Sequence, residues 1–193
     1  MDMLVLGLLI FLGVHALPIF AGTRAALVGR LGAMPYRALF SLVSAAGLAL
    51  IVVGFGRARM DGSPLLYDPP AWTHHVTMLL MLPVFVLLIA TYVPGRIKKI
   101  TRHPMLVAVK LWAFAHLLSN GDLASVLLFG SFLVWAVADR ISVKRRGDPG
   151  TPFSVDLAGE GGLSDILAVL AGLIVYGLFV WKGHALVIGV PLT

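Results

Sequence analysis

Three histidines and one lysine are the side chains of this sequence that could do chemistry inside its apolar segments. His15 lies in the first apolar segment, and His103, Lys110 and His116 follow one another along the fourth. Neutral imidazole binds iron or copper well, and two axial histidines suffice to hold a haem, whose porphyrin supplies the other four nitrogens. His15 and His116 are therefore candidate iron ligands. The competing interpretation is that each one simply hydrogen-bonds to a neighbouring backbone carbonyl or serine.

A charge at the position of Lys110 is costly in the middle of a short apolar helix. Such a lysine must reach the interface, lose its proton, or face a partner or cofactor. His103 lies seven residues earlier, on nearly the same helix face, whereas His116 points to the side of Trp112. Lys110 and His103 are thus the candidate catalytic groups, with a structural hydrogen bond between His103 and Asp139 as the simpler expectation for that pair.

The composition excludes several other classes of site. The 193 residues are 59% hydrophobic and 12% charged, with no cysteine, and their mean hydropathy is +0.96. Without a thiol there is no disulfide, no thiolate-bound iron or zinc, no iron–sulfur cluster and no covalently attached haem. We expect all nine acidic residues in loops or at helix ends, which argues against a carboxylate-bridged di-iron site and an intramembrane proton relay.

Six apolar segments must position these side chains. They cover residues 3–20, 38–55, 76–92, 104–120, 122–141 and 163–181. A bilayer core about 30 Å thick takes about 20 helical residues, and backbone polar groups in lipid must be paired within the helix. The sequence therefore predicts an all-α, polytopic membrane helix bundle of about six transmembrane helices, forming a single domain over residues 1–193.

The basic residues predict the orientation of this bundle in its lipid bilayer. By the positive-inside rule, loops rich in Lys and Arg face the cytoplasm, so both termini are expected outside. The net charge of +6 then reflects topology and attraction to anionic lipid headgroups, and no nucleic acid is needed to explain it. Eleven of the fifteen basic residues lie in the loops after the first, third and fifth segments: Arg24, Arg30, Arg37, Arg96, Lys98, Lys99, Arg102, Arg140, Lys144, Arg145 and Arg146.

The junction between the fourth and fifth segments reads Ser119, Asn120, Gly121 and Asp122. Gly121 suits a left-handed residue that stops one helix, and Asp122 suits the cap of the next. The fourth and fifth segments are thus predicted to be tight antiparallel neighbours.

Three stretches of the sequence together resemble the NnrU family of bacterial integral membrane proteins. They are residues 7–15 (GLLIFLGVH), 102–125 (RHPMLVAVKLWAFAHLLSNGDLAS) and 129–146 (FGSFLVWAVADRISVKRR), so the resemblance covers roughly the first 150 residues. It implies a multi-pass protein of the cell inner membrane that supports the expression or function of nitrite and nitric oxide reductases in denitrification. A plant relative, 15-cis-zeta-carotene isomerase, isomerises a polyene with haem b, which makes a haem-dependent polyene isomerase the alternative.

The resemblance also implies a cofactor, haem b, and its site. The axial ligands match His15 and His116, and His103 and Trp112 stand in the same motif. Ala113 stands where the plant enzyme has a thiolate ligand, so ligand switching through sulfur is not expected. The haem propionates would meet basic residues of the inner side: Arg24, Arg37, Arg96 or Arg102.

Depth in the membrane favours a different pair of histidines. His15 is expected about 7 Å from the cytoplasmic end of the first segment, whereas His116 lies near the outer end of the fourth. The difference exceeds about 10 Å, more than two axial ligands of one iron allow, so His103 fits His15 better. His15 and His116 are the pair that the resemblance implies, and His103 is the geometric rival.

A third hypothesis starts from Arg102, His103 and Pro104, which also resemble the RHP motif of membrane methyltransferases that bind S-adenosylmethionine. Those enzymes pair this motif with a downstream Glu-Glu motif, whereas the single glutamate here is Glu160. A membrane methyltransferase therefore ranks third. An accessory protein of respiratory enzymes and a polyene isomerase both need an apolar pocket beside a redox centre, so both stay open.

Overall fold

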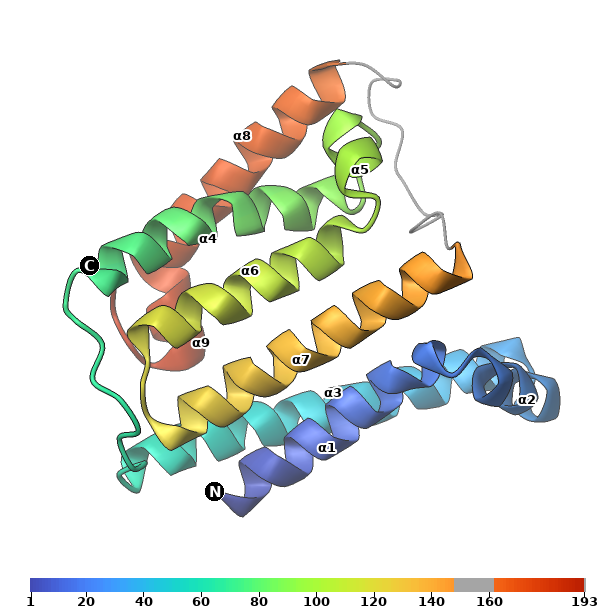
Figure 1. Cartoon of the computed structure of the whole chain (residues 1–193), viewed down its shortest axis with the longest axis horizontal. Helices are drawn as coiled ribbons and strands as arrows, with labels where there is room; N and C mark the ends of the chain where they lie inside the picture. Colours follow the sequence, from blue (N-terminus) through green and yellow to red (C-terminus); the bar gives the residue numbers. More distant parts are fainter. Residues whose placement is uncertain (148–161, 193) are drawn as a thin grey trace.

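The chain forms a bundle of long helices that run back and forth between its two ends (Figure 1). A computed structural model describes residues 1–147 and 162–192. In chain order the described helices are α1 (Asp2–Ala16), a 3-10 turn (Leu17–Ile19), α2 (Ala21–Leu31), α3 (Ala33–Met60), α4 (Thr73–Ala90), α5 (Arg96–Thr101), α6 (Pro104–Ser119), α7 (Leu123–Arg146), α8 (Gly162–Leu178), a π-helical turn (Phe179–Gly183) and α9 (His184–Ile188).

Five of the helical segments are long and apolar enough to cross a membrane. They are Asp2–Ile19, Ala33–Met60, Thr73–Ala90, Leu123–Arg146 and Gly162–Ile188. The sixth predicted span, α6, is apolar but has only 16 residues. The predicted all-α, multi-pass helix bundle is confirmed. Because α6 also runs between the two ends of the bundle, both termini lie at the same end of it (Figure 1).

The helices pack in an order that differs from their order along the chain. α3 packs on α1, α1 on α7, α7 on α6, α6 on α4, and α4 on α8. The backbones of α1 and α3 approach each other closely: a Cβ added at Gly54 would stand 2.4 Å from the backbone nitrogen of Leu4. Gly47 meets the Phe11 backbone in the same way. Small residues let membrane helices approach backbone to backbone, so this pair forms a close-packed edge of the bundle.

The two ends of the bundle, which we call the termini end and the basic end, differ in composition. The termini end holds both chain termini, the connection from α3 to α4 and the turn from α6 to α7. The basic end holds α2 and α5, two short helices that the sequence did not predict. α5 is fixed there by Asp165 of α8, whose carboxylate accepts hydrogen bonds from the backbone nitrogens of Arg96 (3.0 Å) and Ile97 (3.1 Å).

Three sequence predictions about helix ends need correction. The predicted 38–55 span is the middle of a 28-residue helix, α3. α7 continues to Arg146, so Asp139 lies inside this helix and not at its end. Gly121 does not have the left-handed conformation. Its small size is used instead, because a Cβ there would stand 1.8 Å from the carbonyl oxygen of Tyr67.

Candidate functional site

The His15 ring lies where three helices meet near the basic end. Its Nδ1 is 2.7 Å from the carbonyl oxygen of Phe11, one helical turn earlier. The ring stacks on Phe11 at 4.1 Å between centroids and meets the edge of Trp135 of α7 at 5.8 Å. Phe40 of α3 lies 5.1 Å away. The Trp135 indole also donates to the His15 carbonyl oxygen (3.2 Å), so α1 and α7 hold this residue from two sides.

His116 repeats the same arrangement on α6, nearer the termini end. Its Nδ1 is 2.9 Å from the carbonyl oxygen of Trp112, again one turn earlier. The ring stacks on Phe129 of α7 at 4.6 Å, and the Trp112 ring lies 5.6 Å away. Asn120 donates through Nδ2 to the His116 carbonyl oxygen (2.9 Å), which ties this residue to the α6–α7 turn.

These hydrogen bonds decide which ring nitrogen is available. A carbonyl oxygen can only accept, so the Nδ1 of each ring must carry the hydrogen, and a neutral ring then keeps its lone pair on Nε2. Within residues 1–147 and 162–192, neither Nε2 atom forms a hydrogen bond. Metal-ligating histidines are typically oriented by such a bond from the other ring nitrogen. His15 and His116 are thus each prepared as a ligand or as a hydrogen-bond acceptor.

The structure does not bring the two imidazoles to a common point. Aromatic rings stand between them in series: Phe11 lies 5.6 Å from Phe132, and Phe132 lies 5.4 Å from Trp112. Their contacts on α7, Trp135 and Phe129, are six residues apart, which corresponds to about 9 Å along the helix. Among the described residues no group of three or more His, Cys, Asp or Glu could hold a metal ion. The haem site stays a prediction.

The remaining predicted site residues of α6 fall into different surroundings. His103 is buried directly before the helix, and both it and Asp139 are engaged in interactions within the fold. The Trp112 ring lies against the His116 ring. Lys110 is half-buried and forms no hydrogen bond or ion pair with a described residue. The proposed catalytic roles of Lys110 and His103 therefore remain predictions.

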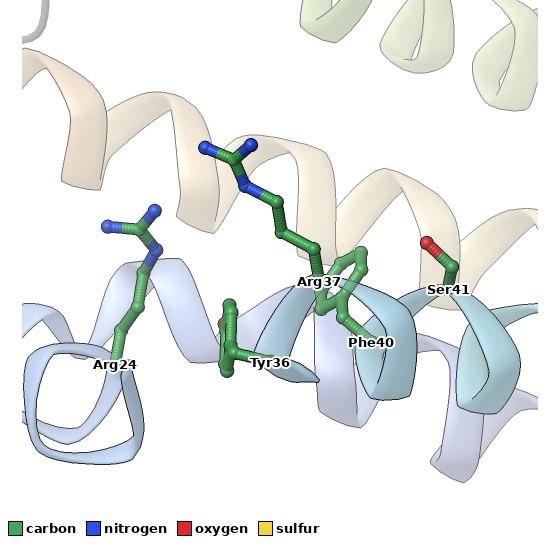
Figure 2. A pocket seen from close by; sticks show the side chains of 5 residues that line it. All are labelled: Arg24, Tyr36, Arg37, Phe40 and Ser41. Atoms are coloured by element: carbon green, nitrogen blue, oxygen red, sulfur yellow. The ribbon is translucent and has the colours of Figure 1, made fainter. Parts of the chain in front are cut away.

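Two of the predicted basic residues border a hollow of about 350 Å³ at the basic end. Figure 2 shows the side chains of Arg24 and Arg37 extending to the same side, with Tyr36 between them. Arg102 is exposed at the junction of α5 and α6, in a strained conformation with φ +59°, and it does not line this hollow. Glu160, which the methyltransferase hypothesis would need, lies outside the described residues. The hollow is lined by Arg24, Tyr36, Arg37, Phe40 and Ser41.

A second, more apolar hollow of about 520 Å³ lies between α1 and α7. Trp135, which contacts the His15 ring, forms part of its wall. Both hollows thus adjoin direct neighbours of His15. The wall consists of Leu12, Ala16, Val126, Leu127, Gly130, Ser131, Val134 and Trp135.

The termini end is closed by a network that the sequence did not predict. Backbone nitrogens of Leu66 and Tyr67 donate to the Gly121 carbonyl oxygen (2.8 and 3.2 Å). In return, the Leu123 nitrogen donates to the carbonyl oxygen of Pro64 (2.8 Å). The Tyr67 hydroxyl donates to the backbone carbonyl oxygens at the end of α6. The α3–α4 connection is thereby fixed onto the α6–α7 turn, which begins one helical turn after His116.

Asp122 caps α7, as the sequence predicts. Its carboxylate accepts from the backbone nitrogen of Ser125 (3.0 Å) and from the Ser125 hydroxyl (2.6 Å). Burial alone would raise the pKa of the Asp122 carboxyl, but hydrogen bonds outweigh it. Those from Ser125 and Ser63, helped by the charge of Arg59, bring this pKa below its ordinary value. Burial, and then the charge of Asp122, raise the pKa of the Tyr67 hydroxyl, which keeps it a donor.

Comparison with known proteins gives one match. The family model described as NnrU protein matches residues 3–192, well beyond the 150 residues over which the sequence motifs extend. No curated protein and no solved structure matches the chain. The family match covers nearly every residue, and the helices are those of a multi-pass membrane protein. The chain belongs to the NnrU protein family.

Proposed function

We propose that this membrane protein binds haem b through the Nε2 atoms of His15 and His116, and that it assists nitrite and nitric oxide reductases in denitrification. One observation carries the cofactor proposal. Both imidazoles give their Nδ1 hydrogen to a backbone carbonyl one turn earlier, which leaves the Nε2 lone pair for a metal. The link to denitrification rests on the family resemblance alone.

Each histidine by itself has the surroundings of a residue that could hold a haem iron. Its ring is oriented by one hydrogen bond, and Phe and Trp rings lie around it, which makes the surroundings apolar, as a porphyrin requires. The two together would hold one iron only if the rings of Phe11, Phe132 and Trp112 moved aside and α1 and α6 shifted to reduce the offset between the two histidines along α7. Haem held by both histidines would supply an iron that changes oxidation state, and a diatomic ligand such as nitric oxide would bind it only in place of one of the two imidazoles.

The visible spectrum of the purified protein tests the cofactor proposal. We expect protein purified in detergent from haem-replete cells to show a Soret band that sharpens and shifts when dithionite is added. Colourless protein from the same cells would refute haem binding. The respiratory role is tested separately, because a strain lacking the protein should reduce nitrite more slowly and recover when the gene is restored.

A haem-dependent polyene isomerase is the second candidate, and the apolar hollow between α1 and α7 favours it. That hollow adjoins Trp135 and the His15 ring, so an apolar ligand lying in it would be near the proposed iron ligand. Cells that express the protein are given a poly-cis carotene, and the isomers are separated by chromatography. Loss of the cis isomer that depends on His15 would favour the isomerase, whereas unchanged carotene would favour the accessory role.

A further inference from the structure

We infer that the hollow at the basic end binds the phosphate headgroup of an anionic phospholipid between Arg24 and Arg37. The two arginines come from different helices, α2 and α3, and border the same hollow of about 350 Å³. In Figure 2 both guanidinium groups extend to one side of the helices that carry them. A phosphate oxygen pair accepts well from two such groups, since guanidinium donates in a planar fork.

The positive charge at this hollow is not neutralised within the described fold. Neither Arg24 nor Arg37 forms a hydrogen bond or an ion pair with any residue of 1–147 or 162–192. The sequence contains no Asp or Glu from residue 3 to residue 60, so α2 and α3 cannot supply a carboxylate next to them. Arg146, at the end of α7, differs from these two arginines because it donates to the Ser142 hydroxyl (2.6 Å).

Tyr36 adds a hydrogen-bond donor to the same hollow. Only 8% of this residue is exposed, and it lines the hollow between the two arginines. Its hydroxyl forms no hydrogen bond with a described residue and is not fully enclosed by the protein. A phosphate held by Arg24 and Arg37 would accept a hydrogen bond from it.

The position and shape of the hollow favour a lipid as the source of this phosphate. α2 is a short basic helix next to the basic end of α3, a spanning helix. Phe40 and Ser41 continue the lining along α3, and the neighbouring Leu39 and Leu42 are exposed (53% and 69%). An acyl chain could follow this apolar surface into the bilayer while the headgroup stays at the arginines. Basic residues at this end also agree with an anionic leaflet.

Lipid retention by the whole protein tests this assignment. Detergent-purified protein is mixed with phosphatidylglycerol or phosphatidylcholine, and bound lipid is counted by native mass spectrometry. We expect one phosphatidylglycerol to be retained at about tenfold lower lipid concentration than phosphatidylcholine. Arg24→Gln and Arg37→Gln should each weaken this retention about tenfold, because each removes a charged hydrogen bond. Tyr36→Phe keeps the ring and should weaken it a few-fold.

Arg30→Gln is the matched control. Arg30 is an exposed arginine of α2, the helix that also carries Arg24, and it does not line the hollow. It should retain lipid as the wild type does, and circular dichroism of every variant checks that the helices persist. Equal retention of the two lipids, or equal weakening by Arg30→Gln, would overturn the proposal. Displacement of the lipid by millimolar inorganic phosphate would assign the hollow to a free anion. Loss of bound haem from the arginine variants with unchanged lipid retention would assign it to the haem propionates instead.

Discussion

The two ends of the bundle carry the same imidazole arrangement in opposite surroundings. His116 lies below the termini end, where the α3–α4 connection and the α6–α7 turn are joined by backbone hydrogen bonds, a tyrosine and a helix cap. His15 lies towards the basic end, beside a hollow whose arginines have no partner in the described fold. At the termini end the polar groups of the two connections pair with one another, whereas at the basic end two arginines of one hollow have no partner among the described residues. The termini end is therefore the structural end of the bundle, and the basic end, with this hollow, is its lipid-binding end.

Gly121→Ala should cause the largest change, because it breaks the structural end at its tightest contact. The added Cβ would stand 1.8 Å from the Tyr67 carbonyl oxygen, and the backbone there cannot give way without losing its bridging hydrogen bonds. We expect a loss of about 3 kcal/mol in the free energy of unfolding, as for overpacked sites. Thermal unfolding in detergent, followed by circular dichroism, measures it.

Gly56→Ala is the matched control for that substitution. Gly56 lies in α3, and a Cβ there would meet no atom within 4 Å. Alanine should leave the melting temperature unchanged or raise it slightly, since alanine in a helix is more favourable than glycine by about 1 kcal/mol. Equal destabilisation by the two substitutions would show that the termini end is not specially packed.

Asp122→Ala should have the next largest effect, because it removes the cap of α7 and leaves the Ser125 nitrogen without its acceptor. We expect about 1 kcal/mol of destabilisation. Arg24→Gln at the lipid-binding end should change stability by less than about 0.5 kcal/mol in the same detergent, since this arginine has no partner among residues 1–147 and 162–192. If Arg24→Gln destabilised the protein as much as Asp122→Ala, the contrast between the two ends would fail.

The pH dependence of stability should show a smaller effect at the structural end. The pKa of Asp122 lies below its ordinary value in the folded protein. Its charged form therefore stabilises the fold above the unfolded-state pKa of about 4, and this contribution is lost as pH falls through the lower folded value. The stability difference between wild type and Asp122→Ala should shrink between pH 7 and pH 3. A difference that stayed constant over this range would contradict the assigned role of the carboxylate.

The sequence predicts the spans well, because length and hydropathy alone decide whether a helix can cross a bilayer. The cap at Asp122 was predicted for a similarly local reason. Gly121 was assigned the wrong role, because the contact that excludes a side chain comes from Tyr67, 54 positions earlier in the chain. Local patterns carry no information about such a pairing.

The candidate site shows the same limit. That both residues are histidines in apolar segments is enough to mark His15 and His116 as possible ligands. The carbonyl oxygen that orients each ring, and the aromatic ring stacked on it, are seen only in the folded chain. The hollow beside Arg24 and Arg37 depends on how α2 meets α3. The sequence does not predict α2, so from the sequence alone these basic residues indicate topology or partners of haem propionates, and no hollow between them.

The most direct test of the central claim is the dithionite-reduced spectrum of three variants, His15→Ala, His116→Ala and His74→Ala. His74 is an exposed histidine of α4, so its variant controls for the loss of an imidazole elsewhere. If the Nε2 atoms of His15 and His116 are haem ligands, each of the first two substitutions shifts or abolishes the Soret band, and His74→Ala leaves it as in the wild type. A wild-type spectrum in both His15→Ala and His116→Ala would contradict the account.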